Sequence, residues 1–308
     1  MTTINDAFST YLSRLELNKS FQDAVSTHHQ AVRSKIAGQL PTAKTILIGS
    51  LQRKTRIQPR EEDEFDIDIL LVMGRFTGWA SGSGGITPHD AMTSGKQALS
   101  KSRYENMGLK VDHPVIGFKY ADSIGVEIVP AYEDHIGQDS LGNNVLPAGR
   151  GYWVASKEGV WVHADYDHDA AVITAHNNAS DLHLVPMIKL LKSLKRQYFP
   201  QMDSFHLEIL AATWMPAIIS ENKKRGIPIT YPSLLQDFFG FTKNSLTSPV
   251  SFASSNTPEQ SLGTASASKS SQTFTEIHRL IASANSRTSQ TAQIEFWLEL
   301  FGKPFPST

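Results

Sequence analysis

The spacing of apolar residues predicts that the chain opens with two amphipathic helices. Apolar side chains recur three or four positions apart, which places them on one face of a helix. The series is interrupted near Asn18, so we expect one helix on each side of that residue. The apolar positions are Ile4, Phe8, Tyr11, Leu12 and Leu15, followed by Phe21, Val25, Val32 and Ile36.

Runs of apolar residues predict strands in the first half of the chain. The segment "KTILIGS" follows Pro41, and a second apolar strand runs from Phe65 to Met73 after a polar loop. Farther along, "HPVIGFKY" and "GVEIVPAY" are joined by "ADSI". This pattern predicts an antiparallel hairpin whose second strand ends at Pro130.

The second half of the chain has a helical period and one unusually polar stretch. From Asp181 onward, apolar residues recur at helical spacing, so we expect residues 1–180 to form a core with the N-terminal helices and residues 181–308 to form a helical lobe. Residues 242–272 contain 14 Ser or Thr in 31 positions. This composition is too polar for a core segment and predicts a mobile surface loop.

Composition and charge narrow the class of protein. The 29 basic and 30 acidic residues nearly cancel, so strong nonspecific binding to duplex nucleic acid is not expected. The lack of cysteine excludes disulfides, Cys-based zinc sites and thiol catalysis. The first residues show neither a signal pattern nor an apolar run near 18 residues. We therefore expect a cytoplasmic protein without membrane attachment.

Two acidic residues interrupt the second apolar strand. Asp66 and Asp68 are two positions apart, so both side chains lie on one face, with Cα atoms roughly 6.5 to 7 Å apart. Most such pairs simply face water. Here the next residues, "LLVM", do not alternate between apolar and polar side chains, which is typical of a buried strand. The acidic face is therefore expected to lie in a cleft. Carboxylates without His or Cys favour magnesium or manganese.

A third acid and a glycine-serine turn complete the pattern. Glu127 lies on the second strand of the predicted hairpin, which could neighbour the acidic strand. Three carboxylates around two metal ions, about 3.5 to 4 Å apart, are suited to in-line phosphoryl transfer. Gly49 and Ser50 follow the first strand, where backbone N–H groups and a hydroxyl can hold a phosphate. Each signal alone is weak, but their order is uncommon by chance.

The chain resembles the CD-NTase family, the cGAS/DncV-like nucleotidyltransferases, in a series of segments taken in order. They are "GSLQRKT", "EFDIDILLV", "VEIVPA" and "IKLLKSLKR" followed by "DSFHLEIL". The resemblance covers about residues 8 to 220. It implies an α+β fold, with a polymerase-β-like nucleotidyltransferase core of mixed sheet and flanking helices and a helical C-terminal lobe. It also implies the joining of nucleoside triphosphates into cyclic or linear oligonucleotide second messengers. In bacteria, such messengers serve antiphage defence through a separate downstream effector.

The resemblance assigns roles residue by residue. It implies that nucleoside triphosphates, whether ATP, GTP or pyrimidine nucleotides, bind with two Mg²⁺ or Mn²⁺ ions, and it allows for a regulatory protein partner. Two positions depart from the family pattern: the third acid is usually Asp, and Lys54 stands where glycine is common. The metal-binding and catalytic residues would be Asp66, Asp68 and Glu127, and the nucleotide-binding residues Gly49, Ser50, Lys192 and Ser204.

Two other functions stay open at this point. A nucleotidyltransferase of the same superfamily could act on RNA ends or on a protein, although the net charge of −1 provides no evident track for an RNA backbone. A catalytically silent nucleotide-binding scaffold is the other alternative. The presence of all three acids together with the Gly-Ser turn argues against it. The base identity of the substrates and the ring size of the product are not determined by these motifs.

Overall fold

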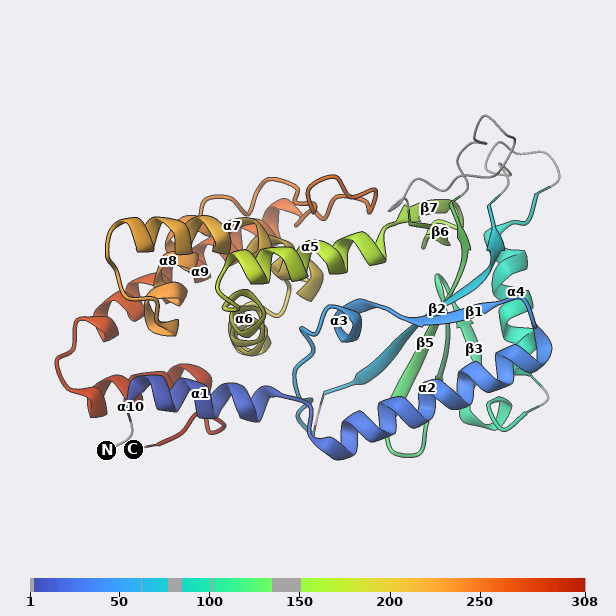
Figure 1. Cartoon of the computed structure of the whole chain (residues 1–308), viewed down its shortest axis with the longest axis horizontal. Coiled ribbons are helices and arrows are strands. Elements are labelled where there is room, and N and C mark those ends of the chain that lie inside the picture. Colours follow the sequence, from blue (N-terminus) through green and yellow to red (C-terminus); the bar gives the residue numbers. More distant parts are fainter. Residues whose placement is uncertain (1–2, 62, 77–84, 101, 135–150, 308) are drawn as a thin grey trace.

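The computed structural model describes residues 3–61, 63–76, 85–100, 102–134 and 151–307. A mixed sheet with its helices lies at one end of an elongated molecule, and a body of helices lies at the other (Figure 1). This arrangement confirms the predicted α+β class with a helical C-terminal region.

The sheet has the order β1-β2-β5-β4-β3, and β6 pairs with β5 and β7 with β6. Strands β2 and β5 run parallel, and the other described pairs are antiparallel. The predicted hairpin is confirmed as β4 and β5. The strands are β1 Lys44–Leu47, β2 Phe65–Arg75, β3 Lys110–Asp112, β4 Val115–Lys119, β5 Ile124–Glu133, β6 Tyr152–Ala155 and β7 Trp161–Ala164.

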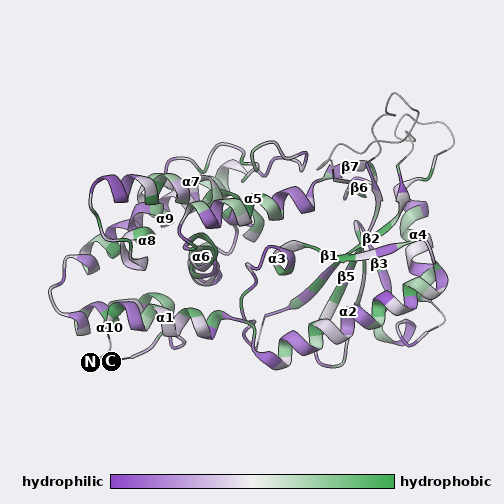
Figure 2. Ribbon diagram, in the orientation of Figure 1, coloured by the Kyte–Doolittle hydropathy of each residue, from purple (hydrophilic) through white to green (hydrophobic). Residues whose placement is uncertain are grey.

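Helices account for most of the remaining described chain. The two predicted N-terminal helices are confirmed as α1 and α2. Helix α2 alternates hydrophilic and hydrophobic positions, as expected of a helix with one covered face (Figure 2). The helices are α1 Ile4–Leu15, α2 Lys19–Gln39, α3 Gly49–Gln52, α4 Pro88–Leu99, α5 Tyr166–Ala179, α6 Leu184–Tyr198, α7 Ser204–Lys224, α8 Tyr231–Thr242, α9 Thr264–Asn285 and α10 Gln290–Phe301.

The sheet and the helical body each have a large cluster of buried hydrophobic residues. One joins α2 and α4 to the sheet and includes Phe65, Ile67 and Ile69 of β2. The other joins α1 and α5 to the helices that follow, so both contribute to the helical cluster although they precede residue 181. Within it, the rings of Phe8 and Trp297 lie 5.0 Å apart. No helix in the described ranges has both the length and the apolar character needed to cross a membrane.

The prediction that Pro130 ends its strand is wrong, because β5 continues to Glu133. The ladder shows why a proline is tolerated there. Strand β4 pairs with β5 as far as Ile128, and β6 begins to pair at Ala131. Pro130 lies at this interruption, where a missing N–H is tolerated.

The predicted loop over residues 242–272 is also wrong in part. Helix α9 begins at Thr264, and the largely exposed stretch before it carries two buried apolar side chains. Leu246 and Phe252 are buried, and the Ser271 hydroxyl donates to the Lys243 carbonyl at 2.6 Å. The high Ser and Thr content suggested a loop throughout. Hydroxyl side chains can satisfy nearby backbone groups, however, so a few buried apolar residues are enough to hold the segment in place.

Candidate active site

The parallel strands β2 and β5 bring the three predicted acids side by side. Asp68 lies opposite Glu127 in the parallel register, and Asp66 lies opposite Gly125. Asp66 and Asp68 are partly exposed, whereas the alternating Phe65 is buried. The predicted division of the strand into an acidic face and a core face is therefore confirmed.

Two glycines make room for the carboxylates. A Cβ at Gly125 would overlap the Oδ1 atom of Asp66, and one at Gly49 would overlap the Oδ2 atom of Asp68. Gly49 also has φ +68°, a conformation that favours glycine. Because the Ile48 N–H donates to the Asp68 carbonyl at 3.0 Å, the Gly-Ser turn is held directly beside the acidic strand.

Burial, with neighbouring carboxylates, raises the pKa of Asp68 and of Glu127. Burial raises the pKa of Asp68 to about 6; nearby Arg56 lowers it, and the charge of Asp66 adds to the rise. Burial also raises the pKa of Glu127, with further contributions from Asp66 and Asp68. The Arg56 guanidinium lies 4.2 Å above the ring of Phe65. A further cation bound beside these residues would therefore stabilise their ionised carboxylates.

The carboxylate oxygens have the chemistry of hard-cation ligands. Among the described residues, however, no three Asp, Glu or His side chains are close enough together to hold one metal ion in common. Asp66 and Asp68 share one strand face, and Glu127 lies across from Asp68. Each neighbouring pair, Asp66 with Asp68 and Asp68 with Glu127, offers carboxylate oxygens of the kind that divalent cations bind.

A cavity of about 560 Å³ opens beside Asp68. All four predicted nucleotide-binding residues line it together with Asp68: Gly49, Ser50, Lys192 and Ser204. Its wall comes from α3 and the loop that follows, and from α6 and α7. Its cationic lining residues are Arg53, Arg56, Lys192, Lys195 and Arg196, and its acidic ones Asp63, Glu64, Asp68 and Glu208. Five cations against four acids make this a mildly basic cavity, suited to a polyanion.

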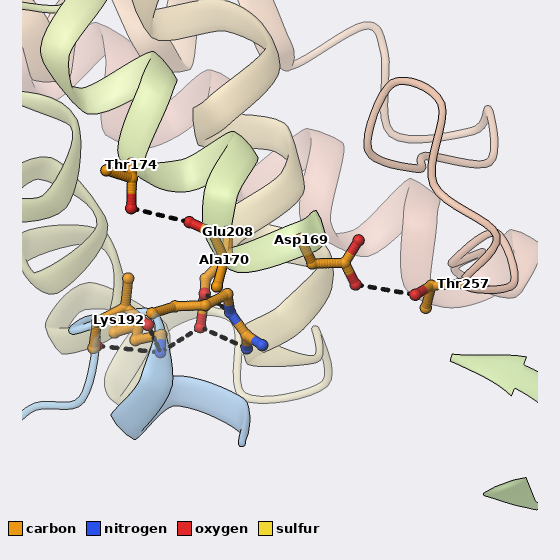
Figure 3. Close-up of polar contacts among 8 residues, drawn as sticks. Asp169, Ala170, Thr174, Lys192, Glu208 and Thr257 are labelled. Atoms are coloured by element: carbon orange, nitrogen blue, oxygen red, sulfur yellow. Dashed lines mark hydrogen bonds and ion pairs between the residues drawn. The ribbon is translucent and has the colours of Figure 1, made fainter. Parts of the chain in front are cut away.

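A buried ion cluster that the sequence did not predict supports this cavity. The Glu208 carboxylate accepts from Lys192 Nζ at 2.6 Å and from Arg53 Nε at 2.6 Å. Figure 3 shows Lys192 of α6 and Glu208 of α7 facing each other. Lys192 also donates to the carbonyl and hydroxyl oxygens of Thr55 at 3.1 and 3.3 Å. The three donors of the ammonium group thus have partners within the protein.

The cluster shifts the pKa values of its members. Burial alone would raise the pKa of Glu208, but Lys192 and Arg53 together lower it to about 2. Burial lowers the pKa of Lys192, and Glu208 opposes that change. Arg53 and Glu208 are 155 positions apart in the chain, so no local motif indicates their contact. The basic run "QRKTR" was the available signal, and such runs are usually solvated.

A second, mostly apolar cavity of about 360 Å³ adjoins the first. Four residues line both cavities: Gly49, Arg53, Asp68 and Phe205. The remaining walls of the second cavity are aliphatic side chains with a few polar groups. The aliphatic residues are Ile48, Val129, Val154, Val162, Ala164 and Pro258, and the polar ones His163, Tyr166, Asp169 and Thr257.

Two carboxylates on one strand, a third on the neighbouring parallel strand and a basic cavity completed by helices define the polymerase-β-like nucleotidyltransferase class. Residues 1–145, slightly less than half of the chain, match the family model of the Second Messenger Oligonucleotide or Dinucleotide Synthetase (SMODS) domain. The predicted resemblance to the CD-NTases is thereby confirmed. Among curated proteins, none matches the sequence.

Solved structures share this fold over nearly the whole chain. Escherichia coli MS115-1 CdnC, solved with ATP, is 18% identical, with 98% of this chain and 99% of that chain covered and a TM-score of 0.65. The same protein in a HORMA-deltaN complex gives 16% identity, 98% coverage of each chain and a TM-score of 0.65. Escherichia coli DncV, bound to 3'-deoxy GTP, is 13% identical, with 95% and 93% covered and a TM-score of 0.72.

Proposed function

We propose that this protein joins nucleoside triphosphates into a cyclic or linear oligonucleotide second messenger and releases pyrophosphate. The observation that carries the proposal is that Asp68 lines both a basic and an apolar cavity. A triphosphate needs cationic surroundings, and a nucleoside needs an apolar pocket. Their junction at a carboxylate is where the α-phosphate would react. The SMODS match over residues 1–145 supports the same reaction.

The roles follow from the placement of the side chains. Asp66, Asp68 and Glu127 would hold two Mg²⁺ or Mn²⁺ ions, which supply activation of the attacking hydroxyl and charge neutralisation at the phosphates. The Gly49–Ser50 turn and Ser204, which line the basic cavity, would donate to the triphosphate. Lys192 would contribute its charge from the cavity wall, where Glu208 and Thr55 hold it.

Partners and biological role are part of the proposal. The CdnC structure with HORMA-deltaN supports a regulatory protein partner for this chain. Structures of relatives with ATP and 3'-deoxy GTP support nucleoside triphosphates as substrates. We propose that the product acts in the cytoplasm on a separate effector in antiphage defence.

The direct test is incubation of the purified protein with all four labelled ribonucleoside triphosphates and either magnesium or manganese. Phosphatase-resistant oligonucleotides and pyrophosphate are the expected products. Label that appears instead on added RNA ends or on the protein would support the alternative nucleotidyltransferases. Nucleotide binding with no transfer under any condition would indicate a silent scaffold.

The third acid should respond to substitution in a graded way. Glu127→Gln removes the charge and should lower the rate on the order of a hundredfold or more, because a metal-directed ligand is lost. Glu127→Asp keeps the charge and should retain part of the rate. Initial pyrophosphate release, measured with magnesium and with manganese, provides the comparison. Glu133→Gln, on the same strand, is the matched control. If both Gln variants keep the wild-type rate, Glu127 is not part of the site.

Gly125 should be needed for activity and not for folding. In Gly125→Ala, the new Cβ would overlap Asp66 Oδ1, so the Asp66 carboxylate must turn away. We expect a rate loss of roughly tenfold or more with an unchanged melting temperature. Gly117→Ala is the control, because the nearest atom to a Cβ there is the Val126 carbonyl oxygen at 3.9 Å. Wild-type activity of Gly125→Ala would show that the position of Asp66 is not critical.

A further inference from the structure

The polar segment that the sequence presented as a loop forms a strap over the N-terminal end of α5. The strap, residues 252–258, is fixed there by two hydroxyl groups. Ser255 Oγ donates to Asp169 Oδ1 at 2.7 Å, and Thr257 Oγ1 donates to Asp169 Oδ2 at 2.9 Å. Figure 3 shows Asp169 directed at Thr257. The Thr257 hydroxyl also accepts from the Asp165 N–H at 2.8 Å, so it has a partner on each side.

The attachment is favoured because Asp169, the carboxylate that receives both hydroxyl groups, is buried. Asp169 is 1% exposed and Asp165 is 0% exposed. A buried carboxylate is costly unless its oxygens accept hydrogen bonds, and the strap supplies both hydroxyl partners of Asp169. The Asn256 N–H adds a longer bond of 3.4 Å to Asp165 Oδ2. The strap is thus part of the folded body.

The strap reaches the candidate active site at two points. Thr257 and Pro258 line the apolar cavity that Asp68 also lines. Phe252 is buried and packs edge-on against Phe205, with ring centroids 5.7 Å apart. Phe205 lines both cavities and carries the Arg53 guanidinium 4.8 Å from its ring centroid.

We propose that the strap is the specificity-determining wall of the nucleoside cavity and that Thr257 is the residue that positions it. This inference rests on the proposed nucleotidyl transfer. A nucleobase in the apolar cavity lies between the aliphatic side chains of the sheet and the strap. The strap position sets the width available to the base and the placement of Phe205. Discrimination among the four nucleoside triphosphates therefore depends on the Thr257–Asp169 hydrogen bond.

The test compares variants at Thr257 with the same change elsewhere in the segment. Thr257→Val keeps the shape and removes the hydroxyl, and should raise the KM for the preferred nucleotide roughly tenfold while changing kcat less. Thr257→Ser keeps the hydroxyl and should restore the wild-type KM. Thr247→Val, at an exposed position of the same segment, is the matched control. The KM for each of the four triphosphates and the base composition of the product are measured for every variant.

The outcomes separate the two proposals. No transfer by the wild-type protein refutes the proposed function. Transfer by the wild type with unchanged KM values and product composition in Thr257→Val overturns the role of the strap. Pro258→Ala provides a second variant should Thr257→Val lower the melting temperature, because Pro258 lines the cavity and its change removes no side-chain hydrogen bond. Altered base selection at an unchanged melting temperature supports the strap, and wild-type selection in Pro258→Ala argues against it.

Discussion

Replacing Asp66 and Asp68 together by Asn should abolish nucleotidyl transfer and leave the protein at least as stable as the wild type. Both side chains belong to the proposed metal site, and loss of two ligands should lower the rate on the order of 10³-fold or more. Stability should not fall, because burial and the charge of Asp66 already disfavour the ionised form of Asp68, whose pKa is raised to about 6. The core face of the strand is unchanged.

Pyrophosphate release and thermal unfolding measure the two halves of this expectation. Asp23→Asn, on an exposed part of α2, is the control for the change of a carboxylate to an amide. A double variant that retains a tenth of the wild-type rate would mean that these residues are not the catalytic acids. A large fall in melting temperature would mean that they serve the fold.

Glu208→Gln should produce the largest loss of stability among the single changes considered. It leaves Lys192 and Arg53 buried without their shared carboxylate. Breaking a buried ion pair by neutralising one partner typically costs about 3 to 5 kcal/mol. Nucleotide binding should weaken as well, since both cations line the basic cavity and their positions depend on Glu208. Added triphosphate should recover part of the stability by supplying the missing negative charge.

The effect of Glu208 should depend on pH in a definite direction. Its pKa is about 2 in the folded protein, against an ordinary value of 4.5. Because the pKa is lower in the folded than in the unfolded protein, ionised Glu208 stabilises the fold at pH values above 4.5. This stabilisation is lost as the pH falls from 4.5 toward 2. The difference in unfolding free energy between wild type and Glu208→Gln should therefore shrink over that range.

Chemical denaturation at several pH values measures the contribution of Glu208. Glu276→Gln is the control, because Glu276 pairs with Arg279 at the surface of α9 and its change should leave the unfolding midpoint unaltered. A difference between wild type and Glu208→Gln that stays constant from pH 6 to pH 3 would contradict the role of the Glu208 charge.

Strand periodicity made the acidic face predictable. Because side chains alternate along β2, burial of Phe65 and Ile67 places Asp66 and Asp68 together on the other face. Glu127 was predicted to lie on a strand next to the acidic strand, and this is correct because β5 pairs with β2. These relations follow from local sequence, and the family resemblance extended them to the fold.

The supporting contacts could not be predicted because they join distant segments. Glu208 and the strap contact residues about 90 to 155 positions away in sequence. The departure at Lys54 has a local explanation that the sequence did not reveal. Lys54 has φ +59°, the left-handed conformation that a glycine adopts without strain, so the backbone at this position is of the kind that favours glycine.

The packing of α1 has a consequence for synthesis of the protein on the ribosome. Phe8 and Tyr11 are fully buried, and their ring partners include Phe301 and Phe305. Those partners are translated nearly 300 residues after α1. Two aromatic side chains of the nascent chain therefore remain without these ring partners until residues 301–305 have been synthesised. Until then, the apolar face of α1 lacks part of its cover, and transiently exposed apolar surface of this kind makes a folding chain prone to aggregation.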